Sequence, residues 1–359
     1  MRMGLVIYGD LETMTGGFLY DRKLVQHLQK RGDEVDVISL PWRTYRRSLL
    51  DNGSGRLLNR LSAEQWGVLL QDELCHPSLF AVNRRLKKRT KYPILSIVHH
   101  LTCCESHPGW LNIFHRRVER RYLDTIDGFI FNSRTTQQEV ERITGASRPG
   151  VVAWPGGNRL DIDISEDEIR ARAHRAGPVE ILFIGVVVPR KGLHTLIQAL
   201  KSLRALSWRL TVVGSQEFDR PYVQEATDQI QKAELERRVH LKGATSDREL
   251  ISLLRDSHLL VVPSYYEGFG IVYIEGMGFG LPALASTGGG AREVVTHGKD
   301  GFLVAPGDSE SLAKYIHLLL EDRNLLEEMS LAAYRRFQSH PTWEASASRV
   351  YDFLHTFPG

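Results

Sequence analysis

Two glutamates, Glu267 and Glu275, stand on either side of a glycine-rich turn. An apolar run precedes the turn and a helical pattern follows it, so Glu267 is expected after a strand and Glu275 about one turn into a helix. A carboxylate accepts two hydrogen bonds, which suits a pair of sugar hydroxyls. Gly268 and Gly270 let backbone N–H groups approach an anion at the helix N-terminus. Binding groups for a sugar, a phosphate and a ribose on one segment predict a nucleotide-sugar site.

Two adjacent cations, Arg190 and Lys191, lie between another predicted strand and helix, in the run Pro189-Arg190-Lys191-Gly192. They suit a diphosphate, whose charge they would neutralise as it leaves. Such a turn alone is more often a solvated helix start. Because the two glutamates lie in the same half of the chain, the cations are interpreted as part of one site.

Other chemistries lack their motifs. The sequence contains no G-x-x-x-x-G-K-[ST], H-E-x-x-H, G-x-S-x-G or C-x-x-C. The first predicted strand leads into Gly9-Asp10-Leu11-Glu12, which is not the dinucleotide-binding glycine pattern. Gly278-Phe279-Gly280-Leu281-Pro282-Ala283 matches that pattern but leads into a strand, so it is expected to be a helix C-terminus. A hydride-transfer enzyme is therefore disfavoured.

Short apolar runs alternate with helical patterns in both halves of the chain. Near-continuous apolar strands with intervening helices are typical of parallel sheets covered on both faces. Two such series predict an α/β protein with two doubly wound domains and ligands at the carboxyl ends of the strands. Strands are expected at residues 5–8, 34–40, 67–70, 94–98, 128–131, 151–154, 180–184, 210–213, 239–241, 259–262 and 282–285, and helices near 17–31, 79–88, 111–124, 135–144, 194–206, 222–233, 248–256, 272–279 and 345–357.

With these motifs, the sequence resembles the retaining glycosyltransferases of family 4. The resemblance covers nearly the whole chain and is strongest from about residue 179 to 307. Its specific part is the segment from Glu267 to Glu275, followed by Gly280-Leu281-Pro282. Supporting matches are Gly16-Gly17, Thr287-Gly288-Gly289-Gly290-Ala291-Arg292-Glu293-Val294-Val295 and Asp300-Gly301-Phe302-Leu303-Val304.

That family has the GT-B fold, in which two Rossmann-like domains face each other across a cleft. The resemblance implies an acceptor-binding domain at residues 1–165 and a nucleotide-sugar domain at 166–340. The seam is expected in the polar stretch 156–178. A C-terminal helix within 341–359 is expected to pack back towards the first domain.

The resemblance also assigns roles. Glu267 would face the transferred sugar, Glu275 would bind the ribose, and Arg190 and Lys191 would hold the diphosphate. His99 matches the family histidine near the reaction centre, with His100 as the alternative. The remaining donor-side residues are Gly16 and Gly17 in the N-terminal loop, the backbone of Gly268, Phe269, Gly270, Ile271 and Val272, and Thr245 and Asp247 beside the nucleoside.

The sequence departs from the family at two places. Val186 stands where relatives often have an arginine, and Trp154-Pro155-Gly156-Gly157-Asn158 replaces a commoner Pro-Asn-Gly run. Both positions bear on nucleotide or hinge contacts, so the resemblance does not fix the donor.

Acidic residues outside the glutamate segment allow two interpretations. Asp72 and Glu73 follow a predicted strand, where one of them is a general base or acceptor anchor, or both simply face solvent. Asp161 and Asp163 form a D-x-D, which binds metal in the other large glycosyltransferase fold. They precede an acidic helix start, so they are interpreted as solvated, and no metal or other cofactor is expected.

Composition and charge limit the partners. Apolar residues make up 42% and charged residues 25% of 359, as in ordinary globular proteins. No apolar run approaches the ~18–20 residues of a membrane span, and the N-terminal apolar stretch ends too soon for a signal peptide. Cys75, Cys103 and Cys104 make no disulfide framework, which favours the cytoplasm. Residues 1–125 hold 20 Lys/Arg against 13 Asp/Glu. This surplus indicates solvated helix faces, or a surface for an anionic substrate or for anionic lipid at the inner membrane face. Nucleic acid is not expected.

The predicted activity is metal-independent sugar transfer from a nucleotide-diphospho-sugar to an acceptor hydroxyl with retention. A phosphorylase and a catalytically silent binding or partner subunit are the alternatives. The acceptor stays open among saccharides, lipid-linked sugars and small molecules. Residues 43–60 are basic with interspersed leucines, which predicts a membrane-surface helix, an acceptor lid or a core-facing helix.

Overall fold

The computed structural model describes residues 1–13, 15–105 and 109–357. The last two residues of the expected C-terminal segment, 358 and 359, lie outside this description. The chain forms two compact units. Unit 1 comprises Met1–Gly156 and Pro341–Gly359, and unit 2 comprises Gly157–His340. The contacts thus divide the chain at Gly156, whereas the sequence-based boundary follows residue 165.

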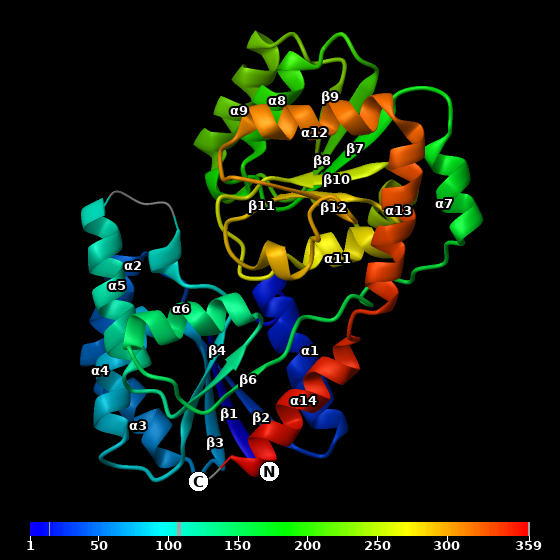
Figure 1. The fold of residues 1–359 in the computed structure, drawn as a ribbon. Coiled ribbons are helices and arrows are strands. Elements are labelled where there is room, and N and C mark those ends of the chain that lie inside the picture. The colour runs from blue at the N-terminus through cyan, green and yellow to red at the C-terminus, as the bar shows by residue number, and fades with distance from the viewer. Residues whose placement is uncertain (14, 106–108, 358–359) are drawn as a thin grey trace. The chain divides into compact units, whose positions relative to one another are not determined.

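Unit 1 is built on a six-stranded parallel sheet in the order β2-β1-β3-β4-β5-β6. Helices α1 and α14 pack against each other, and α4 packs against α5 (Figure 1). The strands are β1 (Arg2–Tyr8), β2 (Glu34–Leu40), β3 (Val68–Asp72), β4 (Ile94–Val98), β5 (Gly128–Phe131) and β6 (Gly150–Val152). The helices are α1 (Gly16–Lys30), α2 (Tyr45–Ser48), α3 (Gly55–Ala63), α4 (His76–Leu86), α5 (Gly109–Leu123), α6 (Arg134–Thr144) and α14 (Trp343–Thr356), with short 3₁₀ turns at Leu49–Gly53, Glu73–Cys75 and Thr102–Cys104.

Unit 2 has a second six-stranded parallel sheet in the order β12-β11-β10-β7-β8-β9. Read from the other edge, this is the Rossmann strand order. The strands are β7 (Val179–Ile184), β8 (Trp208–Val213), β9 (Val239–Gly243), β10 (Leu259–Val262), β11 (Ala283–Ser286) and β12 (Gly301–Val304). The helices are α7 (Glu166–Ala173), α8 (Leu193–Ser202), α9 (Arg220–Lys232), α10 (Asp247–Asp256), α11 (Ile271–Gly278), α12 (Ser309–Glu321) and α13 (Arg323–Gln338), with 3₁₀ turns at Pro189–Lys191 and Gly290–Glu293.

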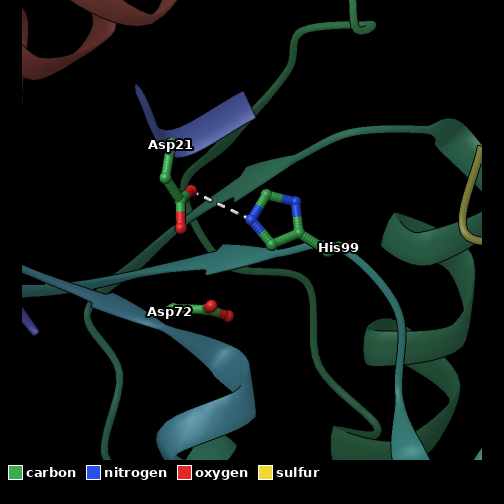
Figure 2. A group of neighbouring side chains, drawn as sticks. All are labelled: Asp21, Asp72 and His99. Atoms are coloured by element: carbon green, nitrogen blue, oxygen red, sulfur yellow. Dashed lines mark hydrogen bonds and ion pairs between the residues drawn. The ribbon is translucent and has the colours of Figure 1, made fainter. Parts of the chain in front are cut away.

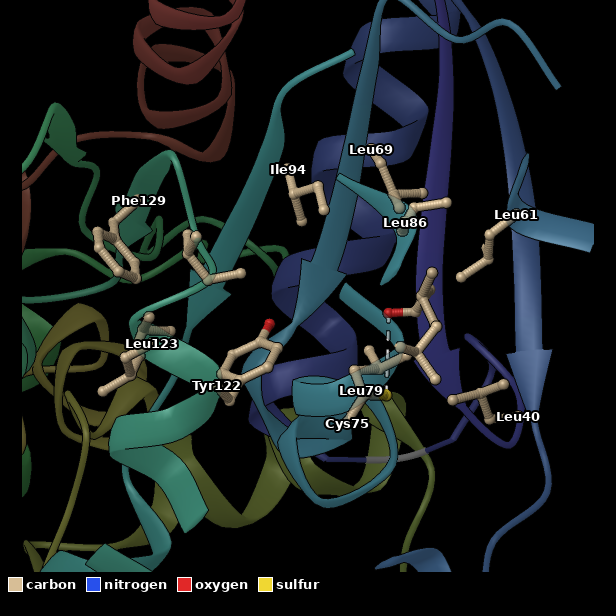
Figure 3. Close-up of a cluster of buried hydrophobic side chains, with 14 of the residues drawn as sticks. Leu40, Leu61, Leu69, Cys75, Leu79, Leu86, Ile94, Tyr122, Leu123 and Phe129 are labelled. Carbon is tan, nitrogen blue, oxygen red and sulfur yellow. Dashed lines mark hydrogen bonds between the residues drawn. The ribbon is translucent and has the colours of Figure 1, made fainter. Parts of the chain in front are cut away.

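The core of unit 1 lies between its sheet and helices α3, α4 and α5 (Figure 3). Leu58 and Leu61 of α3 are buried in this core, so the basic segment 43–60 leads into a core-facing helix. Leu50, in the preceding 3₁₀ turn, is 75% exposed. Burying a leucine side chain such as Leu58 or Leu61 contributes roughly 1.5–3 kcal/mol to the stability of the fold.

Residues 154–158, where the sequence differs from the family pattern, contain two glycines that packing within the units explains. A Cβ on Gly156 would lie 2.1 Å from the backbone nitrogen of Trp343, the first residue of α14. A Cβ on Gly157 would lie 2.9 Å from the ring of Phe337 on α13. Both glycines therefore allow a close approach that a larger residue would block.

Candidate functional site

The predicted donor residues of unit 2 lie at the point where its strand order reverses. The chain passes from β7 to β8 and β9 on one side and then returns to β10 on the other. Lys191 follows β7 and Glu267 follows β10, so both lie beyond the carboxyl ends of adjacent strands. Ligands of doubly wound sheets bind at this switch point.

Glu267 is buried, and its carboxylate is held by three side chains. Lys191 Nζ and Ser264 Oγ both donate to Oε1, the latter at 2.7 Å. Arg190 Nη1 lies 3.8 Å from Oε2 and donates to the Tyr266 carbonyl at 2.9 Å. Burial raises the pKa of Glu267, but the charges of Lys191 and Arg190 outweigh this and lower it to about 2. The carboxylate is therefore ionised at neutral pH and shares its charge with the two cations predicted to hold a diphosphate.

The Glu267 backbone is fixed by the glycine run Gly288-Gly289-Gly290. Glu267 N donates to the Gly288 carbonyl at 3.0 Å, and Gly290 N donates to the Glu267 carbonyl at 2.8 Å. Gly289 has φ +90, and a Cβ there would lie 2.0 Å from the Glu267 oxygen. Only glycine fits this position without displacing the segment that carries Glu267.

Helix α11 begins directly after Gly270, whose φ of +91 lets the chain turn into the helix. A Cβ on Gly270 would lie 2.4 Å from the Tyr273 ring. Phe269 turns its side chain into the interior near His340, while Ile271 and Val272 are half-buried in the first turn. The helix ends at Gly278, which confirms that the glycine pattern there is a C-terminus.

Glu275 is buried on α11 and is paired with Arg159, which the sequence analysis missed. Arg159 Nε donates to Glu275 Oε1 at 2.6 Å, and Nη1 donates to Asp247 Oδ1 at 2.5 Å. Burial raises the pKa of Glu275, while the Arg159 guanidinium opposes this shift. Thr245 lies apart from this group and donates to Glu249. The structure thus brings Glu275 and Asp247 together through one arginine.

In unit 1, His99 follows β4 and forms a buried ion pair with Asp21 of α1 (Figure 2). The distance from Nε2 to Oδ1 is 2.9 Å. Burial lowers the pKa of His99, but the Asp21 carboxylate outweighs this and raises it to about 9. The imidazole is therefore protonated at neutral pH. Asp21 carries no motif signal, and its pairing with a residue distant in sequence explains why it was missed.

The predicted glycine loop lies beside this pair. Gly16 and Gly17 form the first turn of α1, and Thr15 Oγ1 caps it by accepting from Phe18 N. A Cβ on Gly17 would lie 3.1 Å from His99 Cδ2. His100 points elsewhere and is hydrogen-bonded to Glu105 at 3.0 Å. Of the two histidines, His99 is the one next to the glycine loop.

Asp72 and Glu73 are both fully buried, so the interpretation that they simply face solvent is wrong. Asp72 ends β3, the strand next to β4, and Oδ1 accepts from Leu74 N at 3.0 Å. Burial and the nearby Asp21 carboxylate raise the pKa of Asp72 to about 7. The hydropathy pattern missed this burial because it treats every carboxylate as a surface residue.

The D-x-D aspartates differ from these buried acids. Asp161 and Asp163 are exposed and precede α7, which has a capping box formed by Ser165 and Glu168. This confirms the expected acidic helix start. Groups with metal-ligand spacing among the described residues lie instead in unit 1, at Asp21, Asp72 and His99 and at Glu73, His76 and Glu119.

Comparisons with known proteins match unit 2 to a protein family. The family model "Glycosyl transferases group 1" matches residues 165–336. The glycogen synthase of Mycobacterium tuberculosis is 29% identical over 262 residues, which cover 71% of this chain and 61% of that protein. An uncharacterized glycosyltransferase of Methanocaldococcus jannaschii is 24% identical, over 98% of this chain and 97% of its own length. The match to the glycogen synthase therefore spans less than two thirds of that relative.

Solved structures match the whole architecture. Sucrose-phosphate synthase from Thermosynechococcus elongatus superposes with a TM-score of 0.84 at 22% identity, covering 99% of this chain and 98% of its own. The structure of Anabaena HepE in complex with UDP and glucose superposes with a TM-score of 0.77 at 21% identity. The match covers 99% of this chain and 100% of the HepE chain. The two Rossmann-like units thus have the GT-B fold. Residues 165–336, which match the glycosyl transferases group 1 model, lie within the second unit.

Proposed function

We propose that this chain is a retaining glycosyltransferase that moves a sugar from a nucleotide-diphospho-sugar to an acceptor hydroxyl without a metal. The arrangement of Glu267, Lys191 and Arg190 at the start of α11 supports this most strongly. It places two cations and a helix N-terminus around one ionised carboxylate, beside the switch point of a Rossmann sheet. In a sugar diphosphate, the hydroxyls suit the carboxylate, and the negative phosphates suit the two cations and the helix N-terminus.

Each donor residue then has a role. Lys191 and Arg190 hold the diphosphate and stabilise the charge that develops on it as the sugar leaves. Burial lowers the pKa of Lys191, and the Glu267 carboxylate opposes this shift. Glu267 binds the sugar hydroxyls. Glu275 binds the ribose through its carboxylate, which also accepts a hydrogen bond from Arg159. The UDP and UDP-glucose complexes of HepE support a UDP-sugar as the first donor to test.

Retention is proposed to occur by attack from the face that the diphosphate leaves. The leaving diphosphate then accepts the proton of the acceptor hydroxyl, and a new glycosidic bond replaces the sugar–phosphate bond. His99, charged and held by Asp21, donates a hydrogen bond to the sugar. Asp72 is the nearby carboxylate that orients the acceptor. The main work of the protein is positioning and charge stabilisation.

A donor panel tests this proposal. UDP-, GDP-, ADP- and dTDP-sugars are incubated with the protein, with and without EDTA, while thermal stabilisation and sugar release are measured. We expect one nucleotide to stabilise the protein and its sugar to be released slowly, with no effect of EDTA. Glu267→Gln should abolish release, whereas Glu217→Gln, an exposed glutamate of the same unit, should not. Stabilisation without release under any condition would favour the silent binding subunit, and loss of release in EDTA would contradict a metal-free site.

We further propose that unit 1 contacts anionic membrane at the inner face of a cytoplasmic membrane. Helix α5 exposes Trp110 (65%), Ile113 (55%) and Phe114 near its start, followed by exposed Arg116 and Arg117. Apolar and cationic side chains on one helix suit the surface of an anionic bilayer. Among the described helices, none is both long and apolar enough to cross a bilayer. Trp110→Ser should lower the fraction of protein that sediments with phosphatidylglycerol vesicles. Equal binding by the wild type and Trp110→Ser would refute this contact.

A further inference from the structure

Four carboxylates lie buried at one end of the sheet in unit 1. Asp21, Asp72, Glu73 and Glu119 come from α1, the end of β3, the turn after β3, and α5. Within the described ranges 1–13, 15–105 and 109–357, no lysine or arginine forms an ion pair with any of them. The basic side chains beside them are His99, which is paired with Asp21, and His76, which lies next to Glu73. Buried acids without fixed cations are costly in their ionised form, and burial raises the pKa values of Asp72, Glu73 and Glu119.

Glu73 is the least satisfied member of this group. Its side chain is buried, and neither carboxylate oxygen has a hydrogen-bond partner among the residues that the structure places. Oε1 lies 3.1 Å from His76 Nδ1, but that nitrogen also lies 3.0 Å from the Glu73 carbonyl oxygen, with which it is hydrogen-bonded. Burial lowers the pKa of His76, so the ring is neutral. Two free oxygens on one buried carboxylate match a group that offers two N–H donors side by side.

Aromatic rings lie around His76, the residue next to this carboxylate. Tyr45 Oη lies 2.9 Å from His76 Nε2, and the Tyr45 ring is 4.5 Å from the ring of His115. Phe114 packs on Tyr45 at 6.1 Å, and Tyr122 lies 6.3 Å from His76. Aromatic faces attract cations and stack on planar groups.

The donor geometry disfavours a metal in this position. Both His76 nitrogens are engaged, by the Glu73 carbonyl and by Tyr45. The Glu119 oxygens accept from Thr102 N at 2.6 Å and from Cys103 N at 3.1 Å. His99 is protonated and bonded to Asp21, so it has no lone pair to offer at Nε2. Of the described group Glu73, His76 and Glu119, only Glu73 keeps oxygens without a hydrogen-bond partner, which is too few ligands for a stable protein metal site.

We propose that Glu73 binds the acceptor of the transfer reaction, and that this acceptor carries a protonated amine or a planar amidine-type pair of N–H donors. The inference rests on the proposed function, whose acceptor it specifies. Glu73 lies one residue after Asp72. Burial and the Asp72 carboxylate raise the pKa of Glu73 well above its usual range, and the charge of nearby His99 opposes this shift. An acceptor anchored through nitrogen at Glu73 therefore has its hydroxyl close to the residues assigned to the reaction centre of this unit.

Matched pairs of small alcohols test the proposal by isothermal titration calorimetry, without any donor. One pair is 4-(hydroxymethyl)benzamidine and 4-(hydroxymethyl)benzamide, and the other is 2-deoxystreptamine and myo-inositol. We expect the nitrogen-donor member of at least one pair to bind tenfold or more tightly than its partner. Glu73→Gln should remove this preference, whereas Glu34→Gln, an exposed glutamate of the same unit, should keep it.

The wild-type comparison stands even if Glu73→Gln does not fold. Equal affinity within both pairs, including no measurable binding of any member, overturns the proposal. Stabilisation by Zn²⁺ or Mn²⁺ that EDTA reverses and Glu73→Gln removes would assign the cluster to a metal and also overturn it. Release of sugar from a donor is measured separately, so a failure of the acceptor proposal is distinguished from a failure of the proposed function.

Discussion

The pair between His99 and Asp21 predicts a specific pH dependence of stability. In Asp21→Asn the imidazole loses the carboxylate that keeps it charged, while the burial that lowers its pKa remains. The folded-state pKa of His99 is about 9, above the ordinary value of 6.5. Its contribution to stability is therefore complete below pH 6.5 and is lost as the pH rises through 9.

The shift sets the size of the effect. One pKa unit corresponds to about 1.4 kcal/mol, so the pair contributes about 3 kcal/mol to the free energy of unfolding at pH 6. We expect Asp21→Asn to be less stable than the wild type by about this amount at pH 6. The gap should close above pH 9, where His99 is neutral in both proteins and the wild type retains a buried carboxylate without a charged partner.

Urea unfolding followed by tryptophan fluorescence measures this difference. Trp208 is in unit 2, whereas the remaining tryptophans, Trp42, Trp66, Trp110, Trp154 and Trp343, belong to unit 1, so the signal reports mainly on the unit that contains the pair. Asp124→Asn, at an exposed aspartate of unit 1 paired with Arg148, serves as the control. A destabilisation of equal size at pH 6 and pH 9.5 would refute a charged His99.

Further substitutions test the donor site and the core. Glu275→Ala should raise the Kd of the donor tenfold or more by calorimetry, and an unchanged Kd would remove this residue from the site. Lys191→Ala should lower kcat about 10²-fold with little change in KM, because a cation that stabilises the leaving group acts mainly in the transition state; wild-type turnover would refute its role. Gly289→Ala should abolish turnover, because its Cβ would overlap the Glu267 carbonyl, and wild-type activity would show that the loop yields. Leu58→Ala should cost about 2–4 kcal/mol in urea unfolding, and a loss under 1 kcal/mol would contradict its place in the core.

The alternation of strands and helices was predictable because buried parallel strands have short, nearly continuous apolar sequences. β4 occupies the whole run Ile94–Val98, and α11 begins within one residue of the expected start. Helices α12 and α13 have no counterpart among the expected elements. Each follows an aspartate N-cap, Asp308 or Asp322, which is the local signal that would have found it.

The candidate site was predictable where one short segment contains it. Glu267 and Glu275 are in such a segment, together with the glycines that shape its backbone. Arg159 and Asp21 were not predictable, because their partners lie 116 and 78 residues away and an ion pair leaves no periodic pattern in the sequence. The burial of Glu73 likewise depends on α2, α4 and α5 meeting around the end of β3, which only the tertiary structure shows.

The proposed reaction is a metal-independent transfer with retention from a nucleotide-diphospho-sugar. Proton NMR of the first sugar released from an α-linked donor, recorded in EDTA before mutarotation, tests this reaction most directly. We expect the α-anomer to appear first and Glu267→Gln to release no sugar. Initial release of the β-anomer, or release only when a divalent cation is added, would contradict it.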